Sequence, residues 1–436
     1  MSRPPSRPPS IGPNATRREF LRQGGAALVA GATLPYASAT TYHPHGSDVL
    51  RVGLVGCGGR GRGAAAEALK ADPNARLVAL GDAFADPLAD ALSTLASTRE
   101  VAAQVDVPPE RRFVGFDAYQ GVIEASDVVL LATSPHFRPL HVAAAVEAKK
   151  HLFVEKPVAV DAPGVRWMME SSERARARGL SLVSGLCYRY EDAKRETIAR
   201  VHDGAIGDVV ALQCTYNTGG LWHRGRKPEW SEMEYQMRNW LYFTWLSGDH
   251  IAEQHIHSLD KLAWAMRDEY PVKCTASGGR TARTGAEYGN VYDHFNTVFE
   301  WERGVRGFSS CRQWVGADTD VSDHVFGTKG VAQLQRHEIS GENPWRKRRG
   351  EEPDDMYQNE HDALFASIRS GEPIANGEYM CKSTMMAIMA RMSAYTGQSI
   401  TWEEAWSSKL DLTPAAYEWT DVEPAEVARP GVTKFV

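Results

Sequence analysis

The sequence predicts an α/β protein with two domains, the first built on a parallel sheet and the second on a mainly antiparallel one. Short, continuously apolar strands alternate with helices up to about residue 180, a pattern typical of parallel sheets buried on both faces. From about residue 208 the strands are longer and partly alternate apolar with polar residues, as expected where one sheet face packs on helices. A chain of 436 residues can bury both cores.

The order of the expected elements sets the domain boundaries. We expect strands at 49–55, 76–81, 127–133, 151–154 and 180–186, and helices at 63–71, 140–148 and 163–178. In the second half, the strand-like stretches "DVVALQCTY" and "VYDHFNTVFEW" flank an expected helix at 249–266, and helices follow at 359–370 and 381–395. This order predicts domains at 48–180 and 181–400 and a C-terminal tail at 401–436.

The first 39 residues have the composition of an export signal. "TRREFLR" carries the twin arginines Arg17 and Arg18, a short apolar stretch follows, and Ala37-Ser38-Ala39 is a small-residue cleavage site. We therefore expect residues 1–39 to direct the folded protein to the periplasm through the twin-arginine pathway. No later run approaches transmembrane length, so we expect no membrane span in the mature chain.

Charge and cysteine usage narrow the class of protein. The net charge is −6, and residues 1–39 hold five arginines and one glutamate, so the remaining chain carries −10. So acidic a chain, without a basic stripe, is a poor candidate for binding nucleic acid. The six cysteines show neither CxxC nor zinc-ligand spacing, and four lie in apolar or strand-like runs. We expect buried free thiols.

A glycine motif follows the first strand. "GLVGCGGRGRG" contains G-x-G-x-x-G at Gly56, Gly58 and Gly61, it opens a helix, and Asp82 ends the next strand. That context predicts a dinucleotide-binding Rossmann unit. The first glycine makes the tight turn, and Gly58 lets the pyrophosphate approach the helix N-terminus.

Asp82 bears on the choice of cofactor. Its carboxylate would accept hydrogen bonds from the adenosine ribose and repel a 2′-phosphate, which favours NAD over NADP. Arg60 and Arg62 follow the glycines and could neutralise a phosphate, so NADP remains open.

A second motif, Glu155-Lys156-Pro157 in "HLFVEKPVAV", follows a strand. Together with "LLATSPHFRPLHVAAAVEAKKHLFVEKP", "GDHIAEQHIHSLDKLAW" and "NEHDALFASIRSGEPIANG", it makes residues 49–406 resemble the Gfo/Idh/MocA family of sugar oxidoreductases. The resemblance implies a Rossmann domain, then an α/β domain with an open sheet, and a substrate cleft between them. The expected cofactor-binding residues are Gly56, Gly58, Gly59, Arg60, Gly61, Asp82, Thr133, Pro135, His136, Glu155 and Lys156.

The resemblance carries the family's lysine onto Lys156 and its histidine onto His257, with Asp260 after it. This chain departs from the family pattern at Glu253, usually aspartate or asparagine, and at His255, usually glycine. Oxidation of an alcohol needs a base for the hydroxyl proton, and His257 is the candidate. On a continuous helix Glu253 would orient the His257 ring at i, i+4, and Lys156 would hold the alcohol oxygen. The alternatives are a surface lysine and a core histidine.

Two further sets of residues leave alternatives open. Asp249, His250, Glu253 and His257 share one helical face and could hold a metal, although they match no standard ligand spacing and the resemblance implies none. Residues 221–246 are rich in aromatic side chains, which stack on sugar rings but also fill dimer interfaces. The expected substrate residues are Tyr188, Arg189, Trp240 and Asp260.

The export signal constrains the function. With no free nicotinamide pool expected in the periplasm, the cofactor would be loaded before export, retained, and returned to its starting redox state in each cycle. We expect an NAD(P)-dependent oxidoreductase acting on a hydroxyl of a sugar or glycoside, similar to glucose–fructose oxidoreductases, and a homo-oligomer formed through the C-terminal sheet. The alternatives are a redox-neutral NAD-dependent glycosidase or lyase and a non-catalytic sugar-binding protein.

Overall fold

The computed structural model describes residues 49–348, 350 and 354–435, so the predicted export signal lies outside the described residues. The first domain is a six-stranded parallel sheet in the order β3-β2-β1-β4-β5-β6. Its strands are β1 Leu50–Val55, β2 Ala75–Asp82, β3 Arg112–Val114, β4 Val128–Leu131, β5 His151–Val154 and β6 Leu182–Ser184. The strand order reverses between β1 and β4, where a ligand crevice is expected at the carboxyl ends. Because β6 belongs to this sheet, the first domain extends beyond the expected boundary at residue 180.

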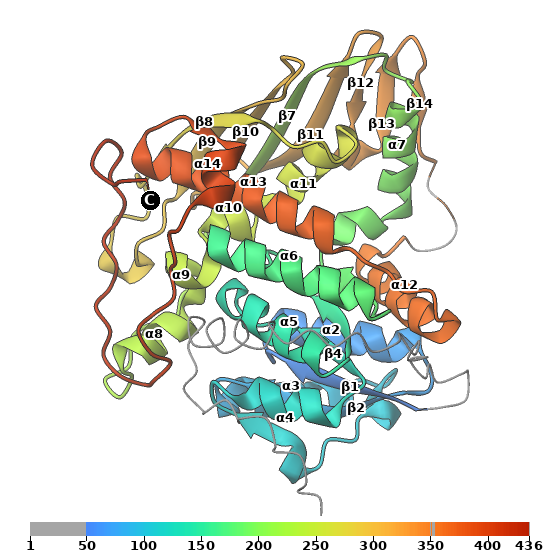
Figure 1. Ribbon diagram of the computed structural model, residues 1–436, viewed down its shortest axis with the longest axis vertical. Helices are drawn as coiled ribbons and strands as arrows, with labels where there is room; N and C mark the ends of the chain where they lie inside the picture. Colours follow the sequence, from blue (N-terminus) through green and yellow to red (C-terminus); the bar gives the residue numbers. More distant parts are fainter. Residues whose placement is uncertain (1–48, 349, 351–353, 436) are drawn as a thin grey trace, which may run out of the picture.

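Helices cover both faces of the first sheet (Figure 1). One face packs on α2 (Gly59–Ala71), α3 (Ala85–Ser97) and α12 (Met356–Ser370), and the other on α4 (Ala118–Ala125), α5 (Arg138–Glu147) and α6 (Ala162–Ala177). The continuous apolar strands are therefore buried on both sides, as predicted. Helix α12 comes from the far end of the chain, and nothing in the sequence pattern indicated that it would return to the first domain.

The second domain contains a nine-stranded open sheet in the order β14-β13-β12-β11-β7-β10-β9-β8-β15. Its strands are β7 Val209–Thr218, β8 Lys273–Gly279, β9 His294–Glu300, β10 Arg306–Gln313, β11 Asp320–Gly327, β12 Gly330–Gln333, β13 Glu338–Gly341, β14 Trp345–Arg346 and β15 Ile400–Thr401. Among these pairs β7 and β10 are parallel and the others are antiparallel, which confirms the predicted sheet. Helix α7 (Asp192–His202) connects the two domains.

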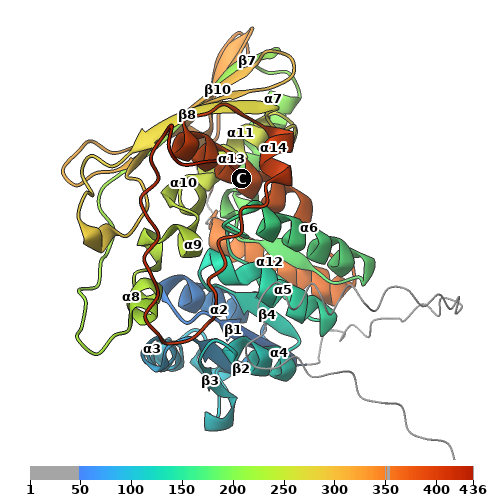
Figure 2. The same cartoon turned by 60° about the vertical axis from the view of Figure 1, so that its left-hand side comes forward.

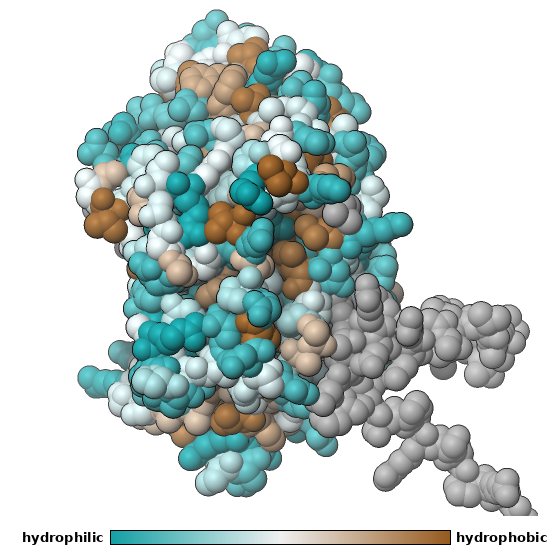
Figure 3. Space-filling model, turned by 90° about the vertical axis from the view of Figure 1, so that its left-hand side faces the viewer, coloured by the Kyte–Doolittle hydropathy of each residue, from teal (hydrophilic) through white to brown (hydrophobic). Residues whose placement is uncertain are grey.

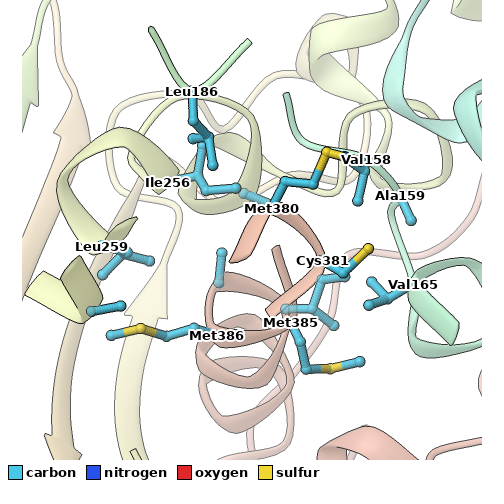
Figure 4. Packing of buried hydrophobic residues seen from close by; sticks show 14 of the residues in the cluster. Val158, Ala159, Val165, Leu186, Ile256, Leu259, Met380, Cys381, Met385 and Met386 are labelled. Atoms are coloured by element: carbon cyan, nitrogen blue, oxygen red, sulfur yellow. The ribbon is translucent and has the colours of Figure 1, made fainter. Parts of the chain in front are cut away.

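Helix α13 (Gly377–Thr396) is the central core element. Figure 4 shows its methionines and Cys381 among apolar side chains from both domains. The contacting residues include Val158, Val165 and Leu186 from the first domain and Ile256 and Leu259 from α11. All six cysteines are buried and free, as predicted. In the part of the chain that the structure describes, no helix has the length and apolarity to cross a membrane.

The helix expected at 249–266 is interrupted. The structure has α10 (His250–Glu253) and α11 (Ile256–Ala265), with Gln254 and His255 between them. His255 is fully buried and its Nε2 lies 2.6 Å from the Ser309 hydroxyl of β10, so the sheet draws this residue out of the helical register. The expected orientation of the His257 ring by Glu253, at i, i+4 on one continuous helix, is therefore wrong.

The end of the chain forms a long irregular segment. After α14 (Trp402–Ser407), residues 408–435, here called the C-terminal strap, run along the outside of the molecule to α8 (Glu232–Arg238) and back (Figures 1 and 2). Leu412 N donates a hydrogen bond to Asp161, and the Ala428 carbonyl accepts one from Tyr292. The strap is thus attached to both domains.

Three buried histidines predict acid-sensitive stability. Burial lowers the pKa of His141 and His255 to about 3 and that of His361 well below its usual range. These rings stay neutral in the folded protein, whereas in the unfolded chain they protonate below about pH 6.5. The unfolded state thus binds more protons as the pH falls, so the free energy of unfolding should decrease by about 1.4 kcal/mol per pH unit for each such histidine.

Glu360 opposes this trend in part, because burial raises the pKa of its carboxyl while the neighbouring Arg60 lowers it. His257, whose pKa burial also lowers, adds to the trend. Urea denaturation at pH 7.5 and 5.5 measures the slope, and His361→Phe should make it shallower. A free energy of unfolding independent of pH over this range would show that these histidines are not neutral in the fold.

Candidate active site

The glycine loop between β1 and α2 forms a cradle. Gly56 has φ +94°, and a Cβ there would lie 2.5 Å from the Thr133 nitrogen. A Cβ on Gly61 would lie 1.9 Å from the Gly56 oxygen, so these two glycines are required by the turn itself. By contrast, Gly58 and Gly59 face open space, because a Cβ at either position would have no heavy atom within 4 Å. That division fits a loop against which a pyrophosphate rests.

A cavity of about 430 Å³ opens over this loop. Its lining includes most of the predicted cofactor-binding residues, namely Gly56, Gly58, Gly59, Arg60, Gly61, Asp82 and Thr133. Pro135, His136, Glu155 and Lys156 do not line it. The sequence did not reveal the aromatic wall formed by Phe84, Phe116, Tyr119, Phe137 and His141. Phe116 and Tyr119 follow β3, which at three residues was too short to recognise from its pattern.

Backbone hydrogen bonds fix the Asp82 side chain at the edge of the cavity. Its carboxylate accepts hydrogen bonds from the backbone N–H groups of Cys57 at 2.7 Å and Phe84 at 3.0 Å. Burial raises the pKa of the Asp82 carboxyl, and these backbone donors oppose the rise. The side chain is thereby fixed at the end of β2, where the predicted contact with the ribose hydroxyls requires it.

Replacing Asp82 by serine should weaken the preference for NAD over NADP by about 1–3 kcal/mol, because a charged acceptor and its repulsion of a 2′-phosphate are both lost. The measurement is the ratio of dissociation constants for the two cofactors in each protein. Asp90→Ser, at an exposed aspartate on the next helix, α3, is the matched control. A wild-type protein that already prefers NADP would contradict the assignment of Asp82 to the ribose.

Lys156 and His257 lie near enough for the lysine charge to act on the histidine ring. The Lys156 ammonium donates to the main-chain oxygen of Glu253 and lies 3.1 Å from its Oε1. Glu253 therefore positions Lys156 and not His257. The His257 ring packs edge-on against Tyr188, with centroids 5.3 Å apart. Burial, followed by the charges of Lys156 and Lys261, lowers the pKa of His257 well below its usual range, so the ring is neutral.

Two family models match successive parts of the chain. Residues 50–183 match the oxidoreductase family with an NAD-binding Rossmann fold, and residues 195–333 match the Gfo/Idh/MocA C-terminal domain. The chain belongs to the Gfo/Idh/MocA family. It is accordingly an NAD-dependent oxidoreductase, and the glycine cradle, the cavity and Asp82 are the features that fit the cofactor.

The relatives of this Gfo/Idh/MocA protein are distant. The 2,7-anhydro-N-acetylneuraminate hydratase of Escherichia coli is 26% identical over 217 residues, 49% of this chain and 53% of that protein. Inositol 2-dehydrogenase 3 of Saccharopolyspora erythraea is 26% identical over 339 residues, 75% of this chain and 86% of the relative. A solved structure of GenD2 from gentamicin A biosynthesis, in complex with NAD, has a TM-score of 0.63 at 18% identity and covers 83% of this chain and 98% of that chain, so it shares the fold.

Arg60 does not serve as a free phosphate ligand in this family member. Its guanidinium contacts Glu155, and it lies 2.7 Å from Glu67 and 2.6 Å from Glu360. Burial alone would lower the pKa of Arg60, but the three carboxylates raise it. Arg60 thus joins the glycine loop, the E-K-P motif and α12. Because Glu155 also accepts a hydrogen bond from the backbone N–H of Lys156 at 3.0 Å, Lys156 is tied to this group.

Two predicted substrate residues have structural roles. Arg189 and Asp260 form a buried two-point ion pair, Nε–Oδ2 and Nη2–Oδ1 both at 2.9 Å, and Arg189 also pairs with Asp268 at 2.6 Å. Their polar atoms are therefore engaged within the protein. Tyr188 differs, because its ring contacts His257 and has the ammonium groups of Lys194 and Lys261 at 4.5 and 4.2 Å from its centroid. Of these three, Tyr188 remains the substrate candidate.

The aromatic segment at 221–246 lies over the cofactor cavity. Trp222, Arg224, Met237, Arg238 and Trp240 line the same cavity as the glycine loop. Trp240, which was predicted to contact the substrate, thus lines the same cavity as the glycine loop. The sequence could not show this, because aromatic residues at that density fit either kind of site.

The four residues considered for a metal have different partners. Asp249 accepts hydrogen bonds from the Tyr395 hydroxyl at 2.6 Å and from Tyr292 N at 2.8 Å, whereas Glu253 binds Lys156. Within residues 49–348, 350 and 354–435, no group of three or more histidine, cysteine or acidic side chains is arranged to hold a metal ion.

Proposed function

We propose that the enzyme oxidises a ring carbon bearing a hydroxyl group in a sugar, a glycoside or a related cyclic polyol. The observation that carries this is the pairing of a fixed cation, Lys156, with a neutral histidine, His257, next to the NAD cradle. NAD, when bound, supplies the hydride acceptor. Lys156 would hold the alcohol oxygen, His257 would take the hydroxyl proton, and Glu253 would keep Lys156 in place.

The substrate class is supported by the relatives. Both the inositol dehydrogenase and the anhydro-neuraminate hydratase are named for compounds with a ring that carries several hydroxyl groups. The hydratase name also favours, as a second candidate, a redox-neutral reaction in which the hydride returns to the substrate. Incubation of the NAD-loaded enzyme with an excess of each sugar or inositol, following both ketone formation and NADH absorbance, separates the two. Oxidation leaves up to one ketone and one NADH per bound NAD, whereas a redox-neutral reaction returns the hydride and leaves neither.

We further propose that the protein works in the periplasm with retained NAD. The support is the twin-arginine pattern of residues 1–39, because that pathway carries folded proteins with their cofactors. Protein purified from the periplasm and then denatured should release about one NAD(H) per chain. With Arg17 and Arg18 changed to lysine, the loaded enzyme should remain in the cytoplasm. Periplasmic protein that is free of NAD and active only with added cofactor would overturn this proposal.

The open face of the second sheet supports a homo-oligomer. On β10 the residues alternate between exposed or half-buried and buried positions. Phe308 is 48% exposed, on the face away from the helices. In register beside it lie Gln213 of β7 and then His324 of β11, whose ring stacks on Phe326. We propose that a second copy covers this face. Light scattering should show an oligomer for the wild type and a monomer for Phe308→Lys, and an unchanged mass would place the interface elsewhere.

A further inference from the structure

We propose that the C-terminal strap is part of the NAD site and sets how fast the cofactor leaves. The strap lies outside the two segments that match the family, which end at residue 333. Retention of the cofactor would therefore be an addition made by this chain's own C-terminus. The inference rests on one part of the proposed function, the retained NAD, and explains how that NAD is held.

Two aromatic residues of the strap pack behind the wall of the cavity. Trp419 lies 5.1 Å from the ring of Phe84 and 4.4 Å from that of Phe116. Tyr417 lies 5.8 Å from Phe116 and 5.5 Å from Phe137. All three phenylalanines line the cavity, on the loops that follow β2, β3 and β4. The strap therefore holds together the loops that surround the adenosine half of the cofactor.

A hydrogen bond fixes this packing. The Tyr417 hydroxyl lies 2.8 Å from Nε2 of His136, which is buried just after β4. His136 was predicted to touch the cofactor, but it faces the strap. Tyr417→Phe keeps the aromatic ring and loses only this hydrogen bond. It can therefore be compared with Trp419→Ala, which loses aromatic packing.

The strap also connects to α8, which closes the cavity from the second domain. The Thr420 carbonyl accepts a hydrogen bond from Met233 N at the start of α8. At the end of α8, Arg238 donates two hydrogen bonds to Asp86 of α3, at 2.9 and 3.1 Å, and lies 4.0 Å above the Phe84 ring. Contacts thus run from the β2 loop to the strap, from the strap to α8, and from α8 back to the β2 loop. This ring of contacts surrounds the adenosine end of the cavity, and one side must open for the dinucleotide to pass.

The position of the strap allows its contacts to be removed without disturbing the core. Trp419 is 41% exposed, so its loss should not unfold either domain. On the side of the molecule that faces the viewer in Figure 3, apolar side chains form separate patches within a largely hydrophilic surface. Trp419 packs against Phe84 and Phe116, which both lie on the cavity loops.

The experiment loads the purified enzyme with radiolabelled NAD and follows release into an excess of unlabelled NAD. Trp419→Ala should raise the dissociation rate by about tenfold, Trp419→Phe by less, and Tyr417→Phe by a few-fold. Val432→Ala, an exposed strap residue distant in sequence from these contacts, is the matched control and should release NAD at the wild-type rate. After dialysis, Trp419→Ala should need added NAD to regain activity.

Unchanged release from Trp419→Ala, in a protein whose circular dichroism and melting temperature match the wild type, would overturn the proposal. Should the alanine variant fold poorly, the comparison of Trp419→Phe and Tyr417→Phe with wild type decides in the same way. The release assay needs no substrate, so its result is independent of which sugar is oxidised. If the wild type itself lost NAD on dialysis, the proposal of a retained NAD would be wrong. The ratio of the NAD dissociation rates of Trp419→Ala and wild type would still test the role of the strap.

Discussion

Changing Lys156 or His257 to alanine is expected to lower kcat by about 10²–10⁴-fold each, with NAD still bound. Lys156 presents a cation held by Glu253, and His257 presents a ring that burial keeps neutral, so one variant loses the group that holds the alcohol oxygen and the other loses the base. The measurement is single-turnover reduction of the bound NAD by a saturating sugar. Near-normal turnover in either variant would remove that residue from the mechanism.

A matched lysine is available as a control. Lys150 lies just before β5, and Lys156 lies just after it. The Lys150 ammonium donates a hydrogen bond to the Ser126 carbonyl, at the opposite end of the strand from Lys156. Lys150→Ala should leave kcat unchanged. A loss as large as that of Lys156→Ala would point to damage to β5 and not to chemistry.

Replacing Gly58 by valine is expected to give a folded protein with no NAD and no activity. The backbone at Gly58 has φ −67°, which any residue adopts, and a Cβ there meets no protein atom within 4 Å. The added side chain would occupy the space that the pyrophosphate needs, weakening binding by roughly 100-fold or more. NAD content after denaturation and the melting temperature together test this.

Gly61 provides the contrasting variant. A side chain there would meet the Gly56 oxygen at 1.9 Å, so Gly61→Val should lower the melting temperature as well as the NAD content. If Gly58→Val instead carried a full complement of NAD, the pyrophosphate would have to lie elsewhere.

The features predicted correctly from the sequence are those that depend on neighbouring residues. The glycine loop was recognisable because a tight turn and an approaching ligand both require glycine at fixed spacing, and Asp82 because it ends the next strand. The parallel and antiparallel sheets were recognisable from how apolar residues recur along each strand.

The features that were missed depend on contacts between distant parts of the chain. The interruption before α11 follows from His255 reaching Ser309, and nothing in the local pattern marks it. Arg60 forms ion pairs with Glu155 and Glu360, which are 95 and 300 residues away along the chain. The sequence therefore could not predict that its guanidinium is already bound within the protein. Aromatic residues indicate burial without identifying what they pack against, which is why residues 221–246 were expected to form either a sugar site or a dimer interface.

The return of α12 to the first domain affects the order in which the protein can be completed during synthesis. Leu364, Phe365 and Ile368 cover part of one face of the NAD-binding sheet, and Glu360 forms an ion pair with Arg60 beside the glycine loop. A nascent chain that ends after β6 therefore leaves that part of the apolar face exposed, and we expect a fragment of residues 49–190 to be poorly soluble. The dinucleotide domain is complete only when more than four-fifths of the chain has emerged, so we expect NAD to bind at the end of translation and not during it.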